Sequence, residues 1–210
     1  MTTDTYVINE TETAVINTTE TEHETDEQTL PGDVAIWIFI LAELLVFGIF
    51  FLAYAITRLS NIELFNESQL NLTREYGAIN TAVLITGSYF VVLAVNAIRQ
   101  NKTQQCGRWL LAALATGTIF TVIKCIEFYE KFSEGINLST NVFYMFYLSL
   151  TFFHFMHVLL GMVILAAVYV KNRQGAYTAK QHMGVETGAA YWHMVDLVWI
   201  ILFPLVYLLH

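Results

Sequence analysis

Five long apolar segments dominate the pattern of hydrophobic and polar positions along the chain. Each is close to, or longer than, the roughly 20 residues that a helix needs to cross the hydrocarbon core of a bilayer, and far longer than a buried strand. Polar connections separate the segments. The pattern therefore predicts an all-α integral membrane protein with five transmembrane helices. The expected spans are residues 34–57, 77–98, 109–128, 142–170 and 188–209.

Composition supports this interpretation and adds an unusual N-terminal tail. Hydrophobic residues make up 56% of the chain and charged residues 13%, about half the share typical of soluble domains. Residues 1–33 hold nine acidic residues and no Lys or Arg. This tail has too few large apolar side chains to offset its ordering entropy, so we expect an acidic disordered tail before a membrane domain at 34–210. The lack of a basic face excludes nucleic-acid binding.

The distribution of basic residues predicts the orientation. Five spans put the N-terminus, the second connection between spans and the fourth on one side of the membrane, the side with more Lys and Arg. That side carries Arg99, Lys102, Arg108, Lys171, Arg173 and Lys180, and the other carries Arg58, Arg74, Lys124 and Lys131. In a bacterial cytoplasmic membrane, the N-terminus is then cytoplasmic and the C-terminus periplasmic.

Ionisable residues at membrane depth are functional candidates because burying them in lipid is costly. Glu43 stands alone in the first span, about 15 Å deep. Its expected roles are proton exchange, contact with a lipid headgroup or another subunit, or a hydrogen bond inside the bundle. His154 and His157 share one face of the fourth span with Gly161 and lie at a similar depth, so a contact between a histidine and Glu43 is geometrically allowed.

Two further groups lie at or near the span ends. In the fifth span, His193 and Asp196 share a face with Trp199, and His193 is the expected donor to Asp196. Glu186 lies just before this span, where it is expected to be solvated or paired with a base. At the outer end of the third span, a self-neutralising rim with snorkelling lysines is expected from the helical spacing of Lys124, Glu127, Glu130 and Lys131.

The histidines do not form an expected haem or metal site. His157 lies about 20 Å and His193 about 8 Å from the same side of the membrane, so about 12 Å of depth separates them. His154 and His157 alone supply two ligands from one helix, fewer than a metal site usually uses. We therefore predict no catalytic residue, no metal ligand and no redox cofactor in this chain.

Four stretches together resemble subunit III of the haem–copper oxidases. They are IWIFILAELLVFGIFFLAYA with its buried Glu43, TVIKCIEFYE, FYMFYLSLTFFHFMHVLLGM and HMGVETGAAYWHMVDLVWIILF, in the order of that family. Because the span with Glu43 comes first, the two extra N-terminal helices of seven-helix members are absent. Among five-helix versions, the sequences of the first, fourth and fifth spans most resemble the E-type accessory protein of nitric oxide reductases, NorE.

The resemblance implies a non-catalytic subunit. Such subunits pack beside a catalytic subunit that holds the haem and the iron or copper, support proton uptake and enzyme lifetime, and bind phospholipid in a cleft. By match, Glu43 is the carboxylate that reacts with carbodiimides, while His154, His157, His193, Asp196 and Glu186 occupy motif positions. The expected complex is nitric oxide reductase in denitrification. The alternatives are subunit III of an aerobic cytochrome c or quinol oxidase, or, in another class, a proton or ion carrier.

Overall fold

A computed structural model describes residues 34–209, and this part of the chain is helical without a β-strand. The elements in chain order are α1 (Val34–Ser60), α2 (Ile62–Leu70), α3 (Arg74–Arg99), α4 (Thr103–Ser133), α5 (Val142–Arg173), α6 (Met183–Phe203) and a π-helix, η2 (Pro204–Leu208). Five helices are long and apolar enough to cross a membrane: α1, α3, α4, α5 and the continuous stretch Met183–Leu208. The predicted fold class is confirmed, and the acidic tail at 1–33 lies outside the described residues.

The helices extend beyond the predicted spans. α4, for example, begins at Thr103 and ends at Ser133, whereas the expected span covered 109–128. The expected spans counted only the apolar stretch. Backbone hydrogen bonding continues past it, because the flanking polar residues include no proline.

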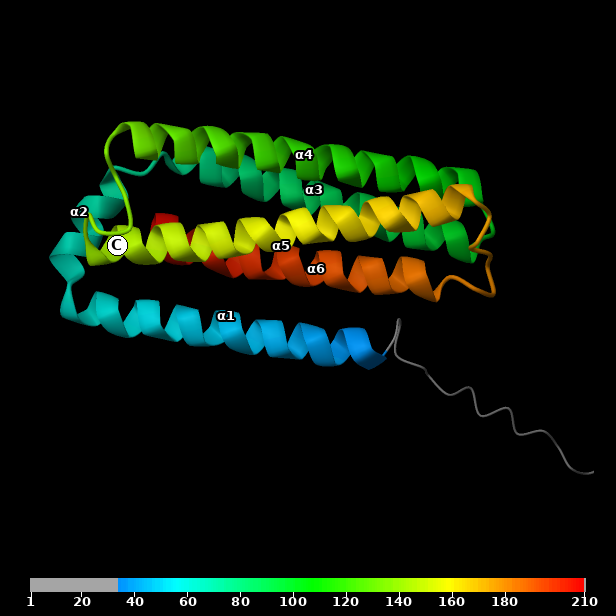
Figure 1. Cartoon of the computed structure of the whole chain (residues 1–210), viewed down its shortest axis with the longest axis horizontal. Coiled ribbons are helices and arrows are strands. Elements are labelled where there is room, and N and C mark those ends of the chain that lie inside the picture. The colour runs from blue at the N-terminus through cyan, green and yellow to red at the C-terminus, as the bar shows by residue number, and fades with distance from the viewer. Residues whose placement is uncertain (1–33, 210) are drawn as a thin grey trace, which may run out of the picture. The chain divides into compact units, whose positions relative to one another are not determined.

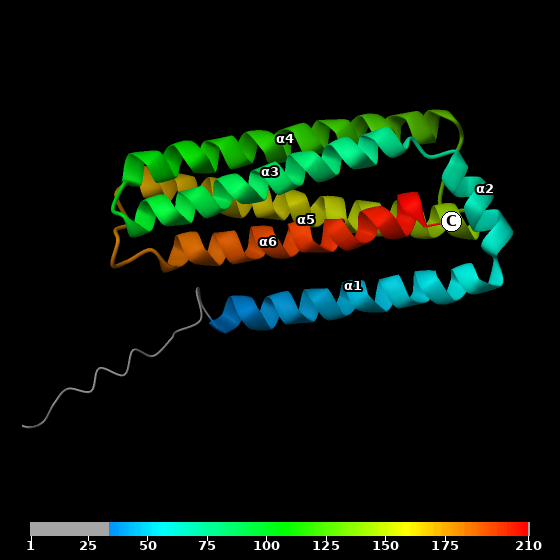
Figure 2. The same ribbon diagram turned by 180° about the vertical axis from the view of Figure 1, so that it is seen from behind.

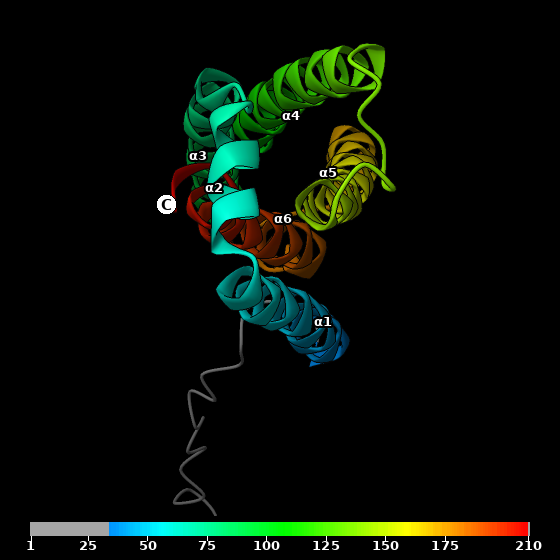
Figure 3. The same cartoon turned by 90° about the vertical axis from the view of Figure 1, so that its left-hand side faces the viewer.

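Successive long helices run antiparallel and form a four-helix bundle with one outer helix. Figures 1 and 2 show α3, α4, α5 and α6 side by side, and the end-on view of Figure 3 shows α1 outside them, against α6. The outer face of α1 is strongly apolar. More than 60% of each of these α1 side chains is exposed: Ile38, Leu41, Leu45, Ile49 and Leu52.

Trp192 of α6 fills the centre of the bundle, where three helices each contribute a glycine. Its side chain is 1% exposed. A Cβ atom added to Gly117 of α4 would lie 2.9 Å from Trp192 Cη2, and one added to Gly161 of α5 would lie 3.2 Å from Cε3. A Cβ atom added to Gly87 of α3 would lie 3.5 Å from Cζ2 of the same indole. These glycines therefore make room for the large ring.

The segment predicted as a polar connection at 58–76 contains a short helix, α2. Phe65 and Gln69 on α2 are fully buried, and Gln69 Nε2 donates to the backbone oxygen of Val206 at 2.9 Å. The α2 sequence is too short and too polar to give a span signal, yet its few apolar residues pack under the end of the bundle. It thereby ties the end of α1 to the C-terminal segment.

A single transmembrane helix was expected at residues 188–209, but the last span is not one uniform α-helix. α6 ends at Phe203, and Pro204 starts η2. Proline has no backbone N–H to donate, so the α-helical ladder is interrupted there and the chain widens to a π-helical turn. This turn places Tyr207, which is fully buried, inside the bundle.

Candidate functional site: buried polar residues between the helices

Glu43 of α1 and His157 of α5 contact each other between the outer helix and the bundle. Glu43 Oε2 lies 3.1 Å from His157 Nε2, and the two side chains are 20% and 10% exposed. The other ring nitrogen, Nδ1, lies 2.8 Å from the backbone oxygen of Phe153. The contact allowed by the similar depth of the two residues is therefore present.

The geometry of this pair determines how many protons it holds. The carbonyl oxygen of Phe153 can only accept, so Nδ1 of His157 carries a hydrogen. In a neutral imidazole, Nε2 then accepts and the Glu43 carboxyl is protonated; in an imidazolium, Nε2 donates to a carboxylate. Either arrangement places one proton between the two side chains and gives the pair no net charge. That neutrality suits a pair at membrane depth.

Aromatic side chains enclose the pair. The Phe47 ring centroid lies 5.3 Å from that of His157 and the Phe153 centroid 4.7 Å, both in edge-on arrangements. Tyr191 of α6 donates its hydroxyl to the backbone oxygen of His157 at 3.3 Å. The rings limit access of water to the shared proton and fix the imidazole plane.

His154 differs from His157 although both lie on α5. It is fully buried, and neither ring nitrogen has a hydrogen-bond partner among the described residues. Its ring lies between Phe120 and Trp199, with centroids 5.9 and 5.1 Å away. His154 therefore makes no hydrogen bond within residues 34–209 and is held there by ring contacts, which also include Phe47.

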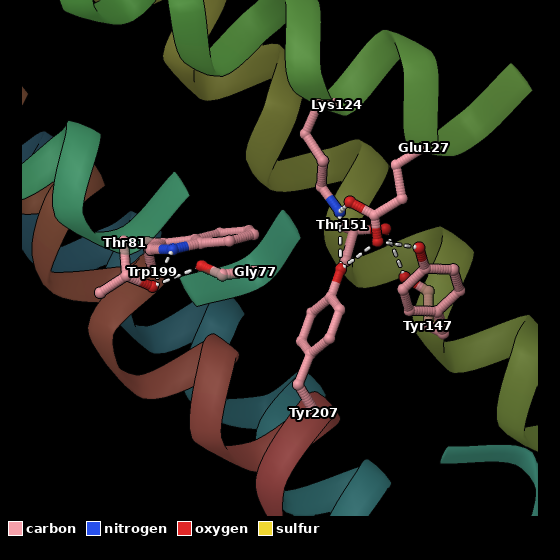
Figure 4. Close-up of polar contacts among 8 residues, drawn as sticks. All are labelled: Gly77, Thr81, Lys124, Glu127, Tyr147, Thr151, Trp199 and Tyr207. Carbon is pink, nitrogen blue, oxygen red and sulfur yellow. Dashed lines mark hydrogen bonds and ion pairs between the residues drawn. The ribbon is translucent and has the colours of Figure 1, made fainter. Parts of the chain in front are cut away.

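Lys124 and Glu127 of α4 form a buried cluster with two tyrosines (Figure 4). Lys124 Nζ lies 3.0 Å from Glu127 Oε2 and donates to the Tyr207 hydroxyl at 2.8 Å. Tyr147 and Tyr207 both donate to Glu127 Oε1, at 2.6 and 2.5 Å. The cluster joins α4, α5 and η2, and its one cation and one carboxylate balance.

This arrangement corrects the predicted interfacial rim. Lys124 is 0% and Glu127 1% exposed, so neither side chain snorkels to the membrane surface. Lys124 Nζ lies 5.2 to 5.5 Å from four ring centroids, those of Phe128, Tyr147, Trp199 and Tyr207. Ring faces attract a cation, which together with the carboxylate offsets the loss of hydration.

The remaining residues of the predicted rim have other partners. Glu130 Oε1 accepts from the Tyr76 hydroxyl at 3.0 Å. Lys131 is buried and pairs with Glu134 at 2.7 Å, rather than with Glu127 as the helical spacing suggested. Tyr147 and Tyr207 were missed from the sequence because tyrosines in apolar segments usually only pack, and no charge marks them.

Trp199 was expected near the interface, and the structure places it in the core. It is fully buried, and its Nε1 donates to Thr81 Oγ1 of α3 at 3.0 Å (Figure 4). Thr81 in turn donates to the backbone oxygen of Gly77 at 2.8 Å. Trp199 therefore links α6 to α3 and separates His154 from the solvent.

His193 and Asp196 do not form the expected contact, since no hydrogen bond or ion pair joins them in residues 34–209. Asp196 is 8% exposed and its Oδ1 has no partner there. His193 lines a groove between α1, α3 and α6. Although the two residues lie one turn apart, one side chain turns into the bundle and the other into the groove.

Glu186 is paired, as the sequence suggested. Its Oε1 lies 2.7 Å from Arg99 Nη2 of α3 and 3.1 Å from His182 Nε2. The pair closes one end of the groove that His193 lines. Within the described residues, no group of three or more His, Cys, Asp or Glu side chains has the arrangement of a metal site.

Taken together, several of these polar groups bind one another across helices. Glu43–His157 joins α1 to α5, Lys124–Glu127 joins α4 to α5 and η2 through the tyrosines, and Glu186–Arg99 joins α6 to α3. Such contacts fix helix positions.

Comparison with known proteins identifies the family of the chain. The family described as "Cytochrome c oxidase subunit III" matches residues 14–210. "Cytochrome c oxidase subunit 3" of Thermostichus vulcanus is 34% identical over 173 residues, which cover 82% of this chain and 84% of the relative. The protein of the same name from Synechocystis sp. is 36% identical, covering 82% and 73%. "Probable cytochrome c oxidase subunit 3" of Rickettsia conorii is 30% identical over 206 residues, covering 89% and 71%. The chain therefore belongs to the cytochrome c oxidase subunit III family.

Proposed function

We propose that this chain is a non-catalytic membrane subunit that associates with, and stabilises, the haem-binding catalytic subunit of a haem–copper-type oxidoreductase. Family membership supports the proposal. The structural observation that carries it is the mutual neutralisation of Lys124 with Glu127 and of Glu43 with His157. These groups are used to join helices, and none is left aimed at a substrate.

Two catalytic partners are candidates. Nitric oxide reductase is favoured by the sequences of the first, fourth and fifth spans, which resemble NorE. An oxygen-reducing cytochrome c oxidase is favoured by the relatives, because the Thermostichus vulcanus protein carries that name and 84% of its length is covered by this chain. A chain with this length and similarity therefore does not by itself indicate nitric oxide reductase. We infer that the chain has the same stabilising role with either partner.

Purification from native membranes tests the role and separates the partners. A tagged chain is expected to co-purify with a haem protein whose turnover consumes either oxygen or nitric oxide. The complex isolated without this chain is expected to lose activity faster during turnover. Isolation of the chain free of any haem protein from membranes that contain the oxidases, or haem or copper ligated by the chain itself, would contradict the proposal.

We further propose a bound phospholipid in the groove between α1, α3 and α6. The groove has a volume of about 440 Å³, and its walls are mainly apolar, with Trp37, Leu44 and Val92 among them. Arg99 and His193 lie at its polar end. Filling it with Ala190→Trp is expected to reduce the lipid retained by the purified chain, as measured by lipid extraction and mass spectrometry. Unchanged retention would contradict this site.

The orientation is also a proposal. The end of the bundle that holds the α3–α4 turn and the α5–α6 connection carries Arg99, Lys102, Arg108, Lys171, Arg173 and Lys180. The excess of basic residues favours the cytoplasmic side of a bacterial membrane for this end and for the start of α1. A protease added to intact spheroplasts is then expected to spare the acidic tail, while the same protease in inverted vesicles removes it.

A proton carrier is the second candidate function, favoured by the exchangeable proton between Glu43 and His157. Proton flux into liposomes that contain only this chain tests it. Flux that is abolished by Glu43→Gln supports a carrier, and no flux above that of empty liposomes rejects one.

A further inference from the structure

A polar cavity of about 510 Å³ lies between the beginning of α4 and the end of α5. It is separate from the groove between α1, α3 and α6. Arg108 and Arg173 line it and are exposed, and no Asp or Glu of residues 34–209 is among its lining residues. Neither guanidinium has a hydrogen bond or ion pair within that part of the chain. Because the cavity lies where two spans end, it faces the level of lipid headgroups.

The start of α4 adds further positive character. Its first turn contains no acidic residue, and no side chain caps its N-terminus. The free N–H groups of this turn and the helix dipole favour an anion. At the end of α5, the last carbonyl groups already accept from the N–H groups of Gln174, Gly175 and Ala176. Arg173 is therefore not needed to satisfy them.

A buried amide at the same cavity supplies the independent sign of a ligand. Asn172 is 5% exposed, and its Nδ2 donates to the backbone oxygen of Thr103 at 2.9 Å. Its Oδ1 has no partner in the described residues. An added Cβ at Gly107 would lie 3.2 Å from Asn172 Nδ2, so glycine makes room for the amide. An unpaired buried acceptor is unfavourable, and a donor on a ligand would satisfy it.

We propose that this cavity binds the phosphate group of an anionic phospholipid. Arg108 and Arg173 bind the phosphate oxygens, since guanidinium groups match phosphate geometry. A hydroxyl or ammonium group of the headgroup donates to Asn172. Leu111 and Tyr169 provide an apolar wall for the glycerol and the first acyl carbons, which favours a lipid over free phosphate. The site is separate from the lipid groove proposed above and does not depend on which oxidoreductase is the partner.

Native mass spectrometry of the full chain tests the site with two probes, phosphatidylglycerol and inorganic phosphate. Gln104 lines the cavity and lies in the first turn of α4, whereas Gln105 is its neighbour outside the cavity. Gln104→Glu places a carboxylate against the phosphate and is expected to weaken lipid binding about tenfold, or about 1.4 kcal/mol. Because an acid in this turn suits the helix dipole, the fold should be preserved. Gln105→Glu, with the same charge change, is expected to bind within about twofold of the wild type.

The double variant Arg108→Gln/Arg173→Gln is expected to lose phosphatidylglycerol to a similar or greater extent. The double variant Lys171→Gln/Lys180→Gln is the control for total charge, because it removes two exposed cations outside the cavity. Wild-type retention in the arginine double variant, or equal losses in Gln104→Glu and Gln105→Glu, would overturn the site. Binding of inorganic phosphate with the same arginine dependence, without lipid binding, would support the phosphate chemistry and overturn the lipid as its source.

Discussion

Glu43 and His157 share one proton across the contact between α1 and α5, and this pair is a polar link between the outer helix and the bundle. Their facing atoms are 3.1 Å apart, and Phe153 fixes the tautomer of the imidazole. Because α1 exposes most of its apolar surface, this contact has a large effect on where the helix lies. Substitutions of Glu43 and His157 test this contribution.

Glu43→Gln is expected to preserve the fold, with a change in melting temperature of no more than a few degrees. The amide of Gln can donate to Nε2 of His157, as the protonated carboxyl does. Glu43→Lys is expected to impair assembly, because an ammonium at this depth faces an imidazole that cannot neutralise it. The yield of folded chain after detergent extraction measures both effects.

The control is Glu63→Lys, which makes the same charge change on an exposed side chain of α2. Its yield should match that of the wild type. Equal yields for Glu43→Lys and Glu63→Lys would show that the Glu43–His157 contact does not hold α1 in place.

His154→Phe and His157→Phe are expected to change stability in opposite directions. Phe at 154 removes two buried ring nitrogens that have no partner and places a ring among Phe120 and Trp199, so stability is expected to be unchanged or to rise by about 1 kcal/mol. Phe at 157 leaves Glu43 without its partner and is expected to cost about 2 kcal/mol or more. Thermal unfolding of the two variants in the same detergent compares them, and equal destabilisation would refute the assigned roles.

The membrane fold was predictable from the sequence because apolar runs of about 20 residues are typical of transmembrane helices and are longer than buried strands. Similar depth allowed a contact between Glu43 and a histidine of the fourth span, but it did not distinguish His157 from His154. Helix ends were less predictable. α2 gives no span signal, and the apolar pattern continues through Pro204, where the missing N–H interrupts the α-helix and a π-helical turn begins.

Side-chain direction limited the prediction of the site. Helical spacing grouped Lys124 with Glu127 and Lys131, yet which face of α4 meets α5 depends on tertiary packing. Glu127 bonds tyrosines 20 and 80 residues further along the chain, and neither carries a charge that signals a partner. The same reason explains His193 and Asp196, whose shared face did not bring their side chains together.

Lys124→Met is expected to destabilise the chain by about 3–5 kcal/mol, because it leaves the Glu127 carboxylate buried without its cation. The double variant Lys124→Met/Glu127→Gln should be less destabilised than the sum of the two single variants by about 1–3 kcal/mol, since neither charge remains. Denaturation of all four proteins in mixed micelles gives the coupling energy. Lys102→Met, at an exposed position, is the control and should have little effect. A coupling energy near zero would show that the two side chains act independently.

Gly117→Ala is expected to lower stability by about 1–3 kcal/mol, because the added methyl group would lie 2.9 Å from the ring of Trp192, where close packing leaves no space. Gly48→Ala is the matched control within a helix: nothing lies within 4 Å of its added Cβ, and alanine favours helix by about 0.8–1 kcal/mol over glycine. The melting temperature should therefore fall for Gly117→Ala and stay the same or rise for Gly48→Ala. The second variant Gly117→Ala/Trp192→Phe should recover part of the loss, because the smaller ring gives back space to the methyl group. Failure of Trp192→Phe to relieve Gly117→Ala would mean that the indole does not set the spacing of α4 and α6.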